Sequence, residues 1–397
     1  MKNFQCSCCN SLVFFEDKVC VQCQHALGFD PQSLAVWAVQ PVEAGALPQS
    51  AGEAGGVVDT VPQALRWQVV GGASGGPVPV GLFRFCRNGI DYGSCHFLVT
   101  ADDGDEFCAS CRQTRVIPNL SVQGNLAAWT TIEDAKRRLF YTLAKLGLEA
   151  GVRGDVGVQT PVYEFMEDVP GEDPVMTGHA SGLITINVAE ADDAERVRRR
   201  EDLHEPYRTL TGHFRHEVGH YYWDQFFLND AQALEECRQV FGDERLDYGE
   251  ALQQHYQNPK PDWQSAYISS YATAHPWEDW AETWAHYLHL MDLLETAASH
   301  QLAFATHGAQ GVSAIQCQDP YEVMLQAEQA DAGQQDQDIT ALLNQGMGVS
   351  LLLNNLNRSL GQDDAYPFAL ATPVLHKLGF IHNIVRRKTR GYQVEQV

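Results

Sequence analysis

The chain has 397 residues, enough for two or three domains, and its 44% apolar and 20% charged residues are typical of a globular protein with a hydrophobic core. A formal net charge of −24 disfavours contact with phosphate backbones, so nucleic-acid binding is not expected. The sequence has no apolar run of about 18 residues that could span a membrane and no apolar signal segment at its start, so we expect a cytoplasmic protein with reduced thiols.

The first motif is a group of four cysteines near the start of the chain. It consists of two C-x-x-C pairs, namely Cys6 with Cys9 and Cys20 with Cys23. Zinc prefers four tetrahedral thiolates and each C-x-x-C turn supplies two, so the spacing predicts a zinc ribbon within residues 1–40. Cys8 could replace Cys6 as the partner of Cys9; we choose Cys6 because it gives the two-residue spacer.

A second group of four cysteines follows. Its members are Cys86, Cys95, Cys108 and Cys111, of which the last two form a C-x-x-C pair. We expect a second four-cysteine zinc module over residues 81–117, joined to the first by a flexible connector with short strands over residues 41–80. Because four protein ligands leave no open coordination position, both zinc ions would be structural. The isolated Cys237 and Cys317 are assigned to packing.

Residues 118–397 are predicted to form one mainly helical domain with a small sheet, which makes the fold class α+β. The β-branched, alternating segment GLITINV (182–188) predicts a strand, and it is our candidate for an edge strand that holds a peptide by main-chain pairing. The predicted helices lie at about 125–146, 207–227, 230–241, 276–298, 320–330, 337–359 and 373–386.

The segment HFRHEVGHYYWD carries the motif H-E-x-x-H. On a helix, His216 and His220 lie one turn apart on one face and can bind one zinc ion, while Glu217 reaches a nearby water without binding the metal. A hydrolytic zinc site needs a third protein ligand, and the segment HPWEDWAETWAHYLHL supplies Glu278 and Glu282, four residues apart. One of these acids could bind zinc while the other accepts a hydrogen bond from a ligand histidine.

These motifs resemble the gluzincin metallopeptidases, in which H-E-x-x-H is followed tens of residues later by a second acidic helix. More closely, the chain is similar to a bacterial family of zinc-binding metallopeptidases with an amino-terminal zinc ribbon. The similar stretches are CNSLVFFED, the 86–111 cysteine group, PYRTLTGHFRHEVGHYYWD, HPWEDWAETWAHYLH and LNRSLGQDDAYPF. The Gly-rich stretch 71–80 and Cys8 depart from the family pattern. The resemblance implies that Glu278 is the third zinc ligand and that Glu282 supports a ligand histidine; Glu282 as the ligand is the alternative.

The predicted function is that of a zinc-dependent metallopeptidase acting on a protein or peptide substrate. Glu217 would take a proton from a zinc-bound water and pass it to the leaving amine. We therefore expect one catalytic and two structural zinc ions, with Tyr271 and His275 as candidate donors to the substrate oxygen. The alternative is a non-catalytic protein-interaction module with a vestigial peptidase domain, against which the intact Glu217 argues.

Overall fold

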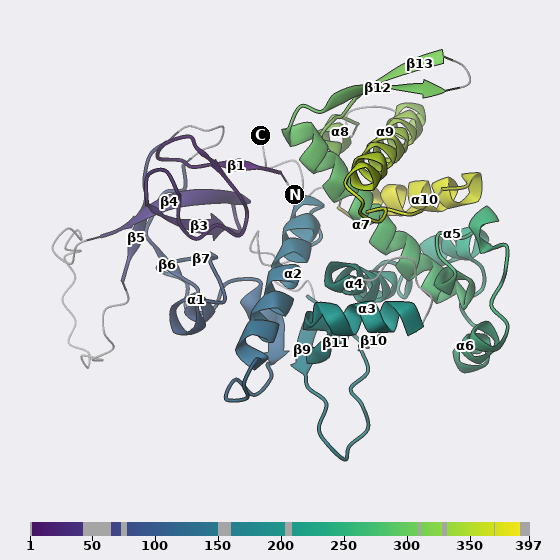
Figure 1. Ribbon diagram of the computed structural model, residues 1–397, viewed down its shortest axis with the longest axis horizontal. Coiled ribbons are helices and arrows are strands. Elements are labelled where there is room, and N and C mark those ends of the chain that lie inside the picture. Colours follow the sequence, from purple (N-terminus) through teal and green to yellow (C-terminus); the bar gives the residue numbers. More distant parts are fainter. Residues whose placement is uncertain are drawn as a thin grey trace. The chain divides into compact units, whose positions relative to one another are not determined.

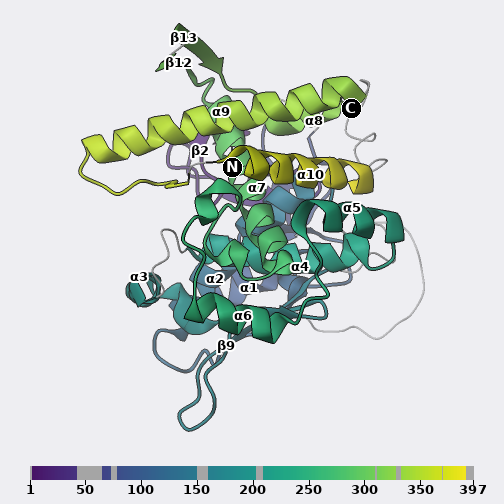
Figure 2. The same cartoon turned by 90° about the vertical axis from the view of Figure 1, so that its right-hand side faces the viewer.

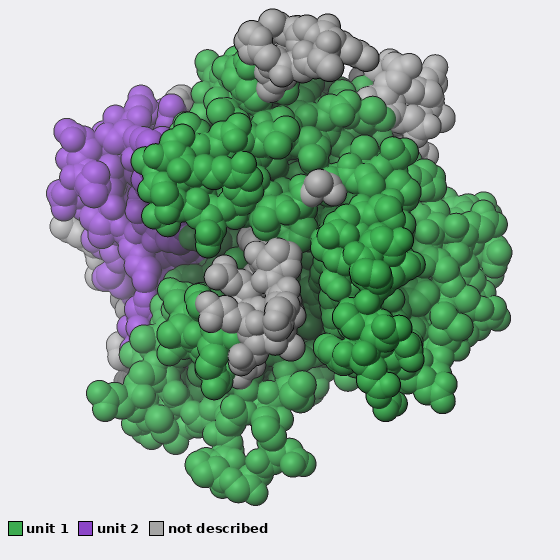
Figure 3. All heavy atoms as spheres, turned by 45° about the vertical axis from the view of Figure 1, so that its right-hand side comes forward, with its two compact units in different colours: residues 1–2, 114–150, 157–397 green, residues 3–113, 151–156 purple. Residues whose placement is uncertain are grey.

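The computed structural model describes residues 2–42, 65–72, 78–149, 160–202, 209–308, 311–327, 332–368 and 370–389. They fall into two compact units, which Figures 1 and 3 show. Unit 2 contains residues 3–113, and unit 1 contains residue 2 and the described residues from 114 onward. Much of the predicted connector, residues 43–64 and 73–77, lies outside the described residues. None of the described helices combines the length and apolar character that crossing a membrane requires.

Unit 2 consists of two antiparallel sheets. The smaller pairs β1 (Phe4–Gln5) with β2 (Leu12–Val13) on either side of the first C-x-x-C turn. The larger has the order β3-β4-β5-β6-β7, formed by Ala26–Asp30, Ala35–Pro41, Trp67–Val69, Phe83–Phe85 and Leu98–Thr100. Of the second cysteine group, Cys86 is the N-cap residue of helix α1 (Arg87–Tyr92), and Cys111 begins the 3-10 turn η1 (Cys111–Gln113). Segments that we expected in separate modules therefore share one sheet, and the predicted domain boundaries stay predictions.

Aromatic side chains fill the centre of unit 2. The rings of Phe29 and Phe97 lie 4.6 Å apart, and Phe15 approaches Phe29 edge-on at 4.9 Å. The Phe29 amide donates a hydrogen bond to the carbonyl of His96, so β3 contacts the segment that leads into β7. The two ends of the five-stranded sheet thus meet around this aromatic cluster.

Unit 1 contains a four-stranded sheet with the order β10-β11-β9-β8, formed by Gly178–Ala180, Leu183–Asn187, Val162–Met166 and Thr114–Val116. The predicted strand at 182–188 is confirmed as β11, but its predicted place at the edge is wrong, because it pairs with β10 on one side and β9 on the other. Ser181 and Gly182 both have positive φ angles, +50° and +86°, which form a two-residue hairpin turn. The edge strands of this sheet are therefore β10, next to β11, and β8 at the other side.

The predicted helices of unit 1 are confirmed to within a few residues at most ends. They are α2 (Asn125–Lys145), α4 (Leu210–Phe227), α5 (Ala231–Phe241), α7 (Pro276–Ser299), α8 (Pro320–Ala327), α9 (Ala332–Ser359) and α10 (Thr372–Thr389). Residues 207–208 and 328–330, included in two of the predictions, lie outside the described residues. The structure adds elements that we did not predict, namely α3 (Asp193–Asp202), α6 (Tyr248–Gln257) and the hairpin of β12 (Ala303–Gly308) and β13 (Gly311–Gln316).

Helices α4 and α7 pack side by side in the centre of unit 1, as Figures 1 and 2 show. Gly219 makes this approach possible, because a Cβ atom there would lie 3.1 Å from both the Ala281 backbone and the Trp284 ring. The Trp280 indole N–H donates a 2.8 Å hydrogen bond to the Gly219 carbonyl across the interface. This close contact brings the histidines of α4 next to the glutamates of α7.

Buried polar pairs hold the same two helices in place. Arg215 on α4 forms an ion pair with Asp292 on α7, and the hydroxyl of Thr142 on α2 donates to Asp292 at 2.9 Å. Near the start of α7, Lys377 of α10 lies 2.6 Å from Asp279. Removing one member of a buried ion pair leaves an uncompensated charge, so these pairs restrict how α4 and α7 can shift.

Candidate active site and metal centres

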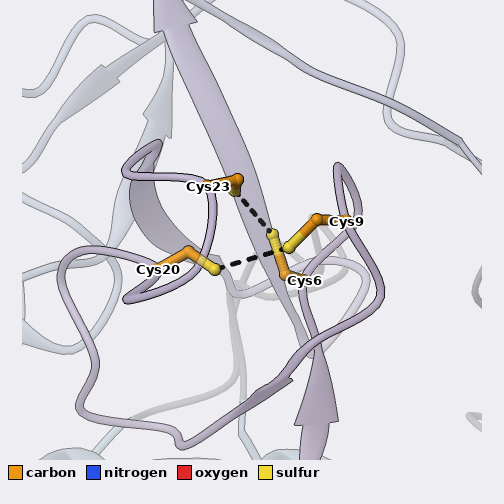
Figure 4. A group of neighbouring side chains, drawn as sticks. All are labelled: Cys6, Cys9, Cys20 and Cys23. Atoms are coloured by element: carbon orange, nitrogen blue, oxygen red, sulfur yellow. Dashed lines mark hydrogen bonds between the residues drawn. The ribbon is translucent and has the colours of Figure 1, made fainter.

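The cysteines of unit 2 gather into two clusters of four. In each cluster the four sulfur atoms lie within 4.8 Å of one another. The clusters are Cys6, Cys9, Cys20 and Cys23, drawn in Figure 4, and Cys86, Cys95, Cys108 and Cys111. None of the eleven cysteines is in a disulfide. The structure thus brings together both predicted quartets.

The sulfur separations match the size of a zinc site. The Cys6–Cys23 and Cys9–Cys20 distances are both 3.6 Å, and the Cys95–Cys108 distance is 3.8 Å. A tetrahedron with Zn–S bonds of about 2.3 Å has edges of about 3.8 Å. Cys8 is exposed and lies outside the first quartet, which favours Cys6 as the partner of Cys9.

Three side chains from α4 and α7 converge in unit 1. The Nε2 atoms of His216 and His220 lie 3.2 Å apart. One carboxylate oxygen of Glu278 lies 3.0 Å from the first of these nitrogens and 3.5 Å from the second. A tetrahedral ion with bonds of about 2.0–2.1 Å has ligand atoms about 3.3 Å apart. The donor set and its spacing therefore fit zinc.

The helix caps place these side chains. The Thr209 hydroxyl accepts a 3.0 Å hydrogen bond from the Gly212 amide and begins α4 about two turns before the motif. His275 caps α7 by accepting from the Trp277 amide at 3.1 Å, and Pro276 follows as the first helical residue. This start puts Glu278 in the first turn of α7. The other ring nitrogen of His275 bonds to the Leu246 carbonyl, so His275 acts as a cap.

The structure separates the positions of the two glutamates of α7. Glu282 lies on the opposite side of the His216 ring, 2.7 Å from Nδ1, and its other oxygen accepts from the Ser269 hydroxyl at 2.6 Å. Burial opposes a charge on His216, yet the hydrogen bonds and charges of Glu278 and Glu282 raise its pKa well above the usual value. The Glu278 oxygen that faces the imidazoles is buried, and its polar neighbours are the Nε2 atoms of His216 and His220. All three atoms are donors that zinc accepts as ligands.

Glu217 lies on α4 between the two histidines in sequence. Its side chain is only 9% exposed, yet no hydrogen bond or ion pair within the described part of the chain holds its carboxylate. Burial raises the pKa of Tyr248, and the charges of Glu278 and Glu217 add to the rise. Glu217 thus follows the first ligand histidine directly on α4, and no described group holds its carboxylate.

Two tyrosines, Tyr248 and Tyr271, adjoin the site. We had not predicted Tyr248 as a site residue. The Tyr248 hydroxyl donates a 2.7 Å hydrogen bond to the second oxygen of Glu278, and it is also hydrogen-bonded to Tyr271. The Tyr271 ring lies 5.9 Å from that of His216. The signal for Tyr248 was available, because Asp247 caps α6 and Glu250 stands three residues later, a helix-start pattern.

The edge strand β10 also contacts the histidine helix. The ring of His179 on β10 stacks with that of His220 at 6.2 Å, and the ring of Trp277 packs against that of His220 at 4.0 Å. Burial and the neighbouring His220 lower the pKa of His179 to about 4, so its ring is neutral at pH 7. Among the described strands β10 pairs only with β11, and through His179 this edge strand contacts the ligand His220.

Residues 125–384 match the model of a protein family described as "Putative zinc-binding metallo-peptidase". The chain belongs to this family. Residues 3–122 match the model of a zinc-ribbon domain, and both descriptions, with the two four-cysteine clusters, support zinc binding. The predicted resemblance to zinc-ribbon metallopeptidases and the α+β class are therefore confirmed.

Curated relatives of this metallopeptidase family member occur in mycobacteria. An uncharacterised protein of Mycobacterium bovis is 33% identical over 390 residues, which cover 97% of this chain and 95% of the relative. Uncharacterised proteins from two strains of Mycobacterium tuberculosis match with the same identity and coverage. No solved structure is significantly similar to the chain.

Proposed function

We propose that the protein is a zinc-dependent peptidase that hydrolyses peptide bonds. His216, His220 and Glu278 hold the catalytic zinc and leave one corner of its tetrahedron open. The observation that carries this proposal is the convergence of three ligand atoms, 3.0–3.5 Å apart. Glu217, which follows His216 on α4, is the proposed base. The two cysteine quartets hold structural zinc, since their four thiolates fill the coordination sphere.

The protein residues divide the chemistry among them. A zinc ion bound to these ligands supplies the positive charge that polarises a carbonyl and acidifies water. Glu217 accepts the proton of the attacking water and delivers it to the leaving amine. Glu282 accepts a hydrogen bond from Nδ1 of His216, which fixes the tautomer whose Nε2 lone pair faces the ion. Tyr248 fixes the Glu278 carboxylate through its second oxygen.

The substrate is an extended stretch of polypeptide. β10 is an edge strand next to His220, so its free main-chain groups can pair with a peptide laid across the site. Main-chain pairing can recognise any unfolded segment, because the backbone N–H and C=O groups of such a segment are not already paired within its own fold. The eleven cysteines without a disulfide fit a reducing compartment, and we place the protein in the cytoplasm as part of the proposal.

A comparison of Glu217→Gln with the unchanged protein tests the proposal. Glu217 is outside the ligand set, so the variant should keep its zinc and lose cleavage of an unstructured protein by about 100-fold or more. The matched control is Glu235→Gln, a glutamate on α5 whose side chain is 62% exposed. Zinc content and a profile of new amino termini in digested cell lysate are the measurements.

Two outcomes would contradict the proposal. Equal cleavage by Glu217→Gln and the unchanged protein would remove Glu217 from the mechanism. No cleavage by either protein, with zinc retained in both, would favour the alternative of a non-catalytic interaction protein.

A further inference from the structure

A third group of possible metal ligands lies beside the first cysteine quartet. The ligand atoms of Cys8, Cys23 and His25 all lie within 4.8 Å of one another. Cys23 belongs to both groups, whereas Cys8 and His25 have no part in the function proposed above. The Nδ1 atom of His25 is buried and has no hydrogen-bond partner among the described residues, which is costly unless something binds there.

The backbone fixes the position of Cys8 in this group. Ser7, the preceding residue, donates from its hydroxyl to the Val70 carbonyl at 2.8 Å and accepts from the Ala38 amide at 3.0 Å. Within the same turn, the Asn10 amide donates to the carbonyl of Cys6 at 2.8 Å. A cysteine side chain has one rotatable bond to its sulfur, so the thiol of Cys8 has few alternative positions.

The backbone also fixes His25. Its carbonyl accepts a 2.9 Å hydrogen bond from the Cys20 amide, which closes the second C-x-x-C turn. The next residue, Ala26, begins β3. The ring of His25 is therefore held beside Cys23 by the same turn that presents Cys20 and Cys23 to the first quartet.

We propose that Cys8, Cys23 and His25 form an additional zinc site that shares the Cys23 thiolate with the first structural zinc. Two thiolates and an imidazole are donors that zinc favours over magnesium or calcium. A zinc ion with four thiolates has a net charge of −2, which attracts a second cation. Binding deprotonates Cys8 and releases its proton to solvent, so the pair of centres then has a net charge of −1.

The additional site differs from the quartet in how it holds its ion. Only three protein ligands surround it among the described residues, which leaves one coordination position for water or an incoming ligand. Cys8 is exposed, whereas Cys6 and Cys20 of the quartet are buried. The additional zinc is therefore the exchangeable one, and the quartet keeps its own ion when the additional zinc leaves.

The test measures alkylation of Cys8 in the full-length protein. The protein is first dialysed, so that only tightly bound zinc remains. Mass spectrometry then follows the labelling of each cysteine by iodoacetamide, with and without added Zn²⁺. Zinc at ten times its dissociation constant should slow Cys8 labelling about tenfold, because only the unbound fraction reacts. Protection should disappear in His25→Ala and His25→Gln, and it should persist in His300→Ala, a change at an exposed histidine outside the cluster.

Zinc content provides a second readout that does not depend on labelling. Added zinc should raise the content of the unchanged protein by one ion per chain, and Cys8→Ser should keep the resident ions without this increase. Labelling of Cys8 at the same rate with and without zinc would overturn the proposal. Protection of Cys8 already after dialysis, with Cys6 or Cys9 labelled instead, would also overturn it, because Cys8 would then be a member of the quartet. Neither readout involves peptide cleavage, so the outcome is independent of the proposed peptidase activity.

Discussion

At the scale of single residues, Glu278 and Glu282 lie on opposite sides of the His216 ring. Their positions predict that Glu278 is a zinc ligand and that Glu282 supports His216. Glu278 faces Nε2 of His216 and Glu282 faces Nδ1. We expect Glu278→Ala to lose the zinc of this site on dialysis, because only two protein ligands remain. Glu282→Gln should keep the ion but bind it about 10–100-fold more weakly. Zinc content and competition with a chelator measure the two effects.

Tyr248→Phe is the control for this pair of variants. It removes the hydroxyl that contacts the second oxygen of Glu278 but leaves all three ligand atoms in place. It should keep the zinc, with at most a modest loss of affinity. Retention of zinc by Glu278→Ala together with its loss from Glu282→Gln would reverse the two roles and make Glu282 the ligand.

The sequence could predict which residues meet at the site but not which atoms face each other. The four-residue spacing places Glu278 and Glu282 on one face of α7, and either could then reach the histidines. The outcome depends on the crossing of α4 over α7, which is determined by packing at Gly219 rather than by any motif. Tyr248 follows a helix-start pattern, but its contact with Glu278, like that of Ser269 with Glu282, depends on the tertiary fold.

At the scale of elements, the contact of α4 with α7 depends on the absence of a side chain at Gly219. A Cβ atom there would lie 3.1 Å from the backbone of Ala281 and from the buried ring of Trp284. Gly219→Ala should therefore push the helices apart and destabilise the protein by about 1–3 kcal/mol. The shift also moves Glu278 away from the histidines, so zinc affinity should fall. Thermal unfolding and a zinc titration measure both effects.

Gly379→Ala is the matched control for this change. Gly379 also lies within a helix, α10, but a Cβ atom there meets no atom within 4 Å. Alanine at that position should be neutral or stabilise the helix by up to about 1 kcal/mol. If Gly219→Ala behaves like Gly379→Ala in both measurements, the close approach of α4 and α7 is not what positions the site.

Local signals predicted the elements around the site unevenly. Pro276 is a local helix-start signal, and α7 begins there as predicted. Thr209 is the corresponding signal for α4, but we began that helix at about 207. The hairpin of β10 and β11 was also signalled, by the turn at Ser181 and Gly182, but we began the strand at Gly182 and so missed its partner. As a result, we took β11, which lies inside the sheet, for an edge strand, whereas the edge strand next to it is β10.

At the scale of the whole molecule, the sequence predicted the two cysteine groups but not the five-stranded sheet that they share. Each group follows from spacing within a short segment. The sheet pairs β4 (35–41) with β5 (67–69), across a segment that lies mostly outside the described residues. Pairing between such distant short strands depends on loop closure and register, which no local pattern encodes.

The ligand sets also predict two classes of zinc ion. Three resident ions are expected after dialysis, one at the histidine–glutamate site and one in each cysteine quartet. The first would have an open coordination position that a chelator can enter, whereas four thiolates would close each quartet. Mild chelation should therefore lower the content from three ions to two and abolish cleavage.

The helices should survive this first loss of zinc. Around the site, α4 and α7 remain packed through the buried rings of Trp280 and Trp284, so the circular dichroism of the helices should stay unchanged. Removal of the other two ions should require harsher chelation, and it should unfold unit 2, whose short strands depend on the quartets. Zinc content and circular dichroism at each step measure the order of release. The first ion released could instead be accompanied by loss of the β-strand circular dichroism signal, with cleavage unchanged. That ion would then belong to a quartet, and the histidine–glutamate site would not be the one that chelators reach first.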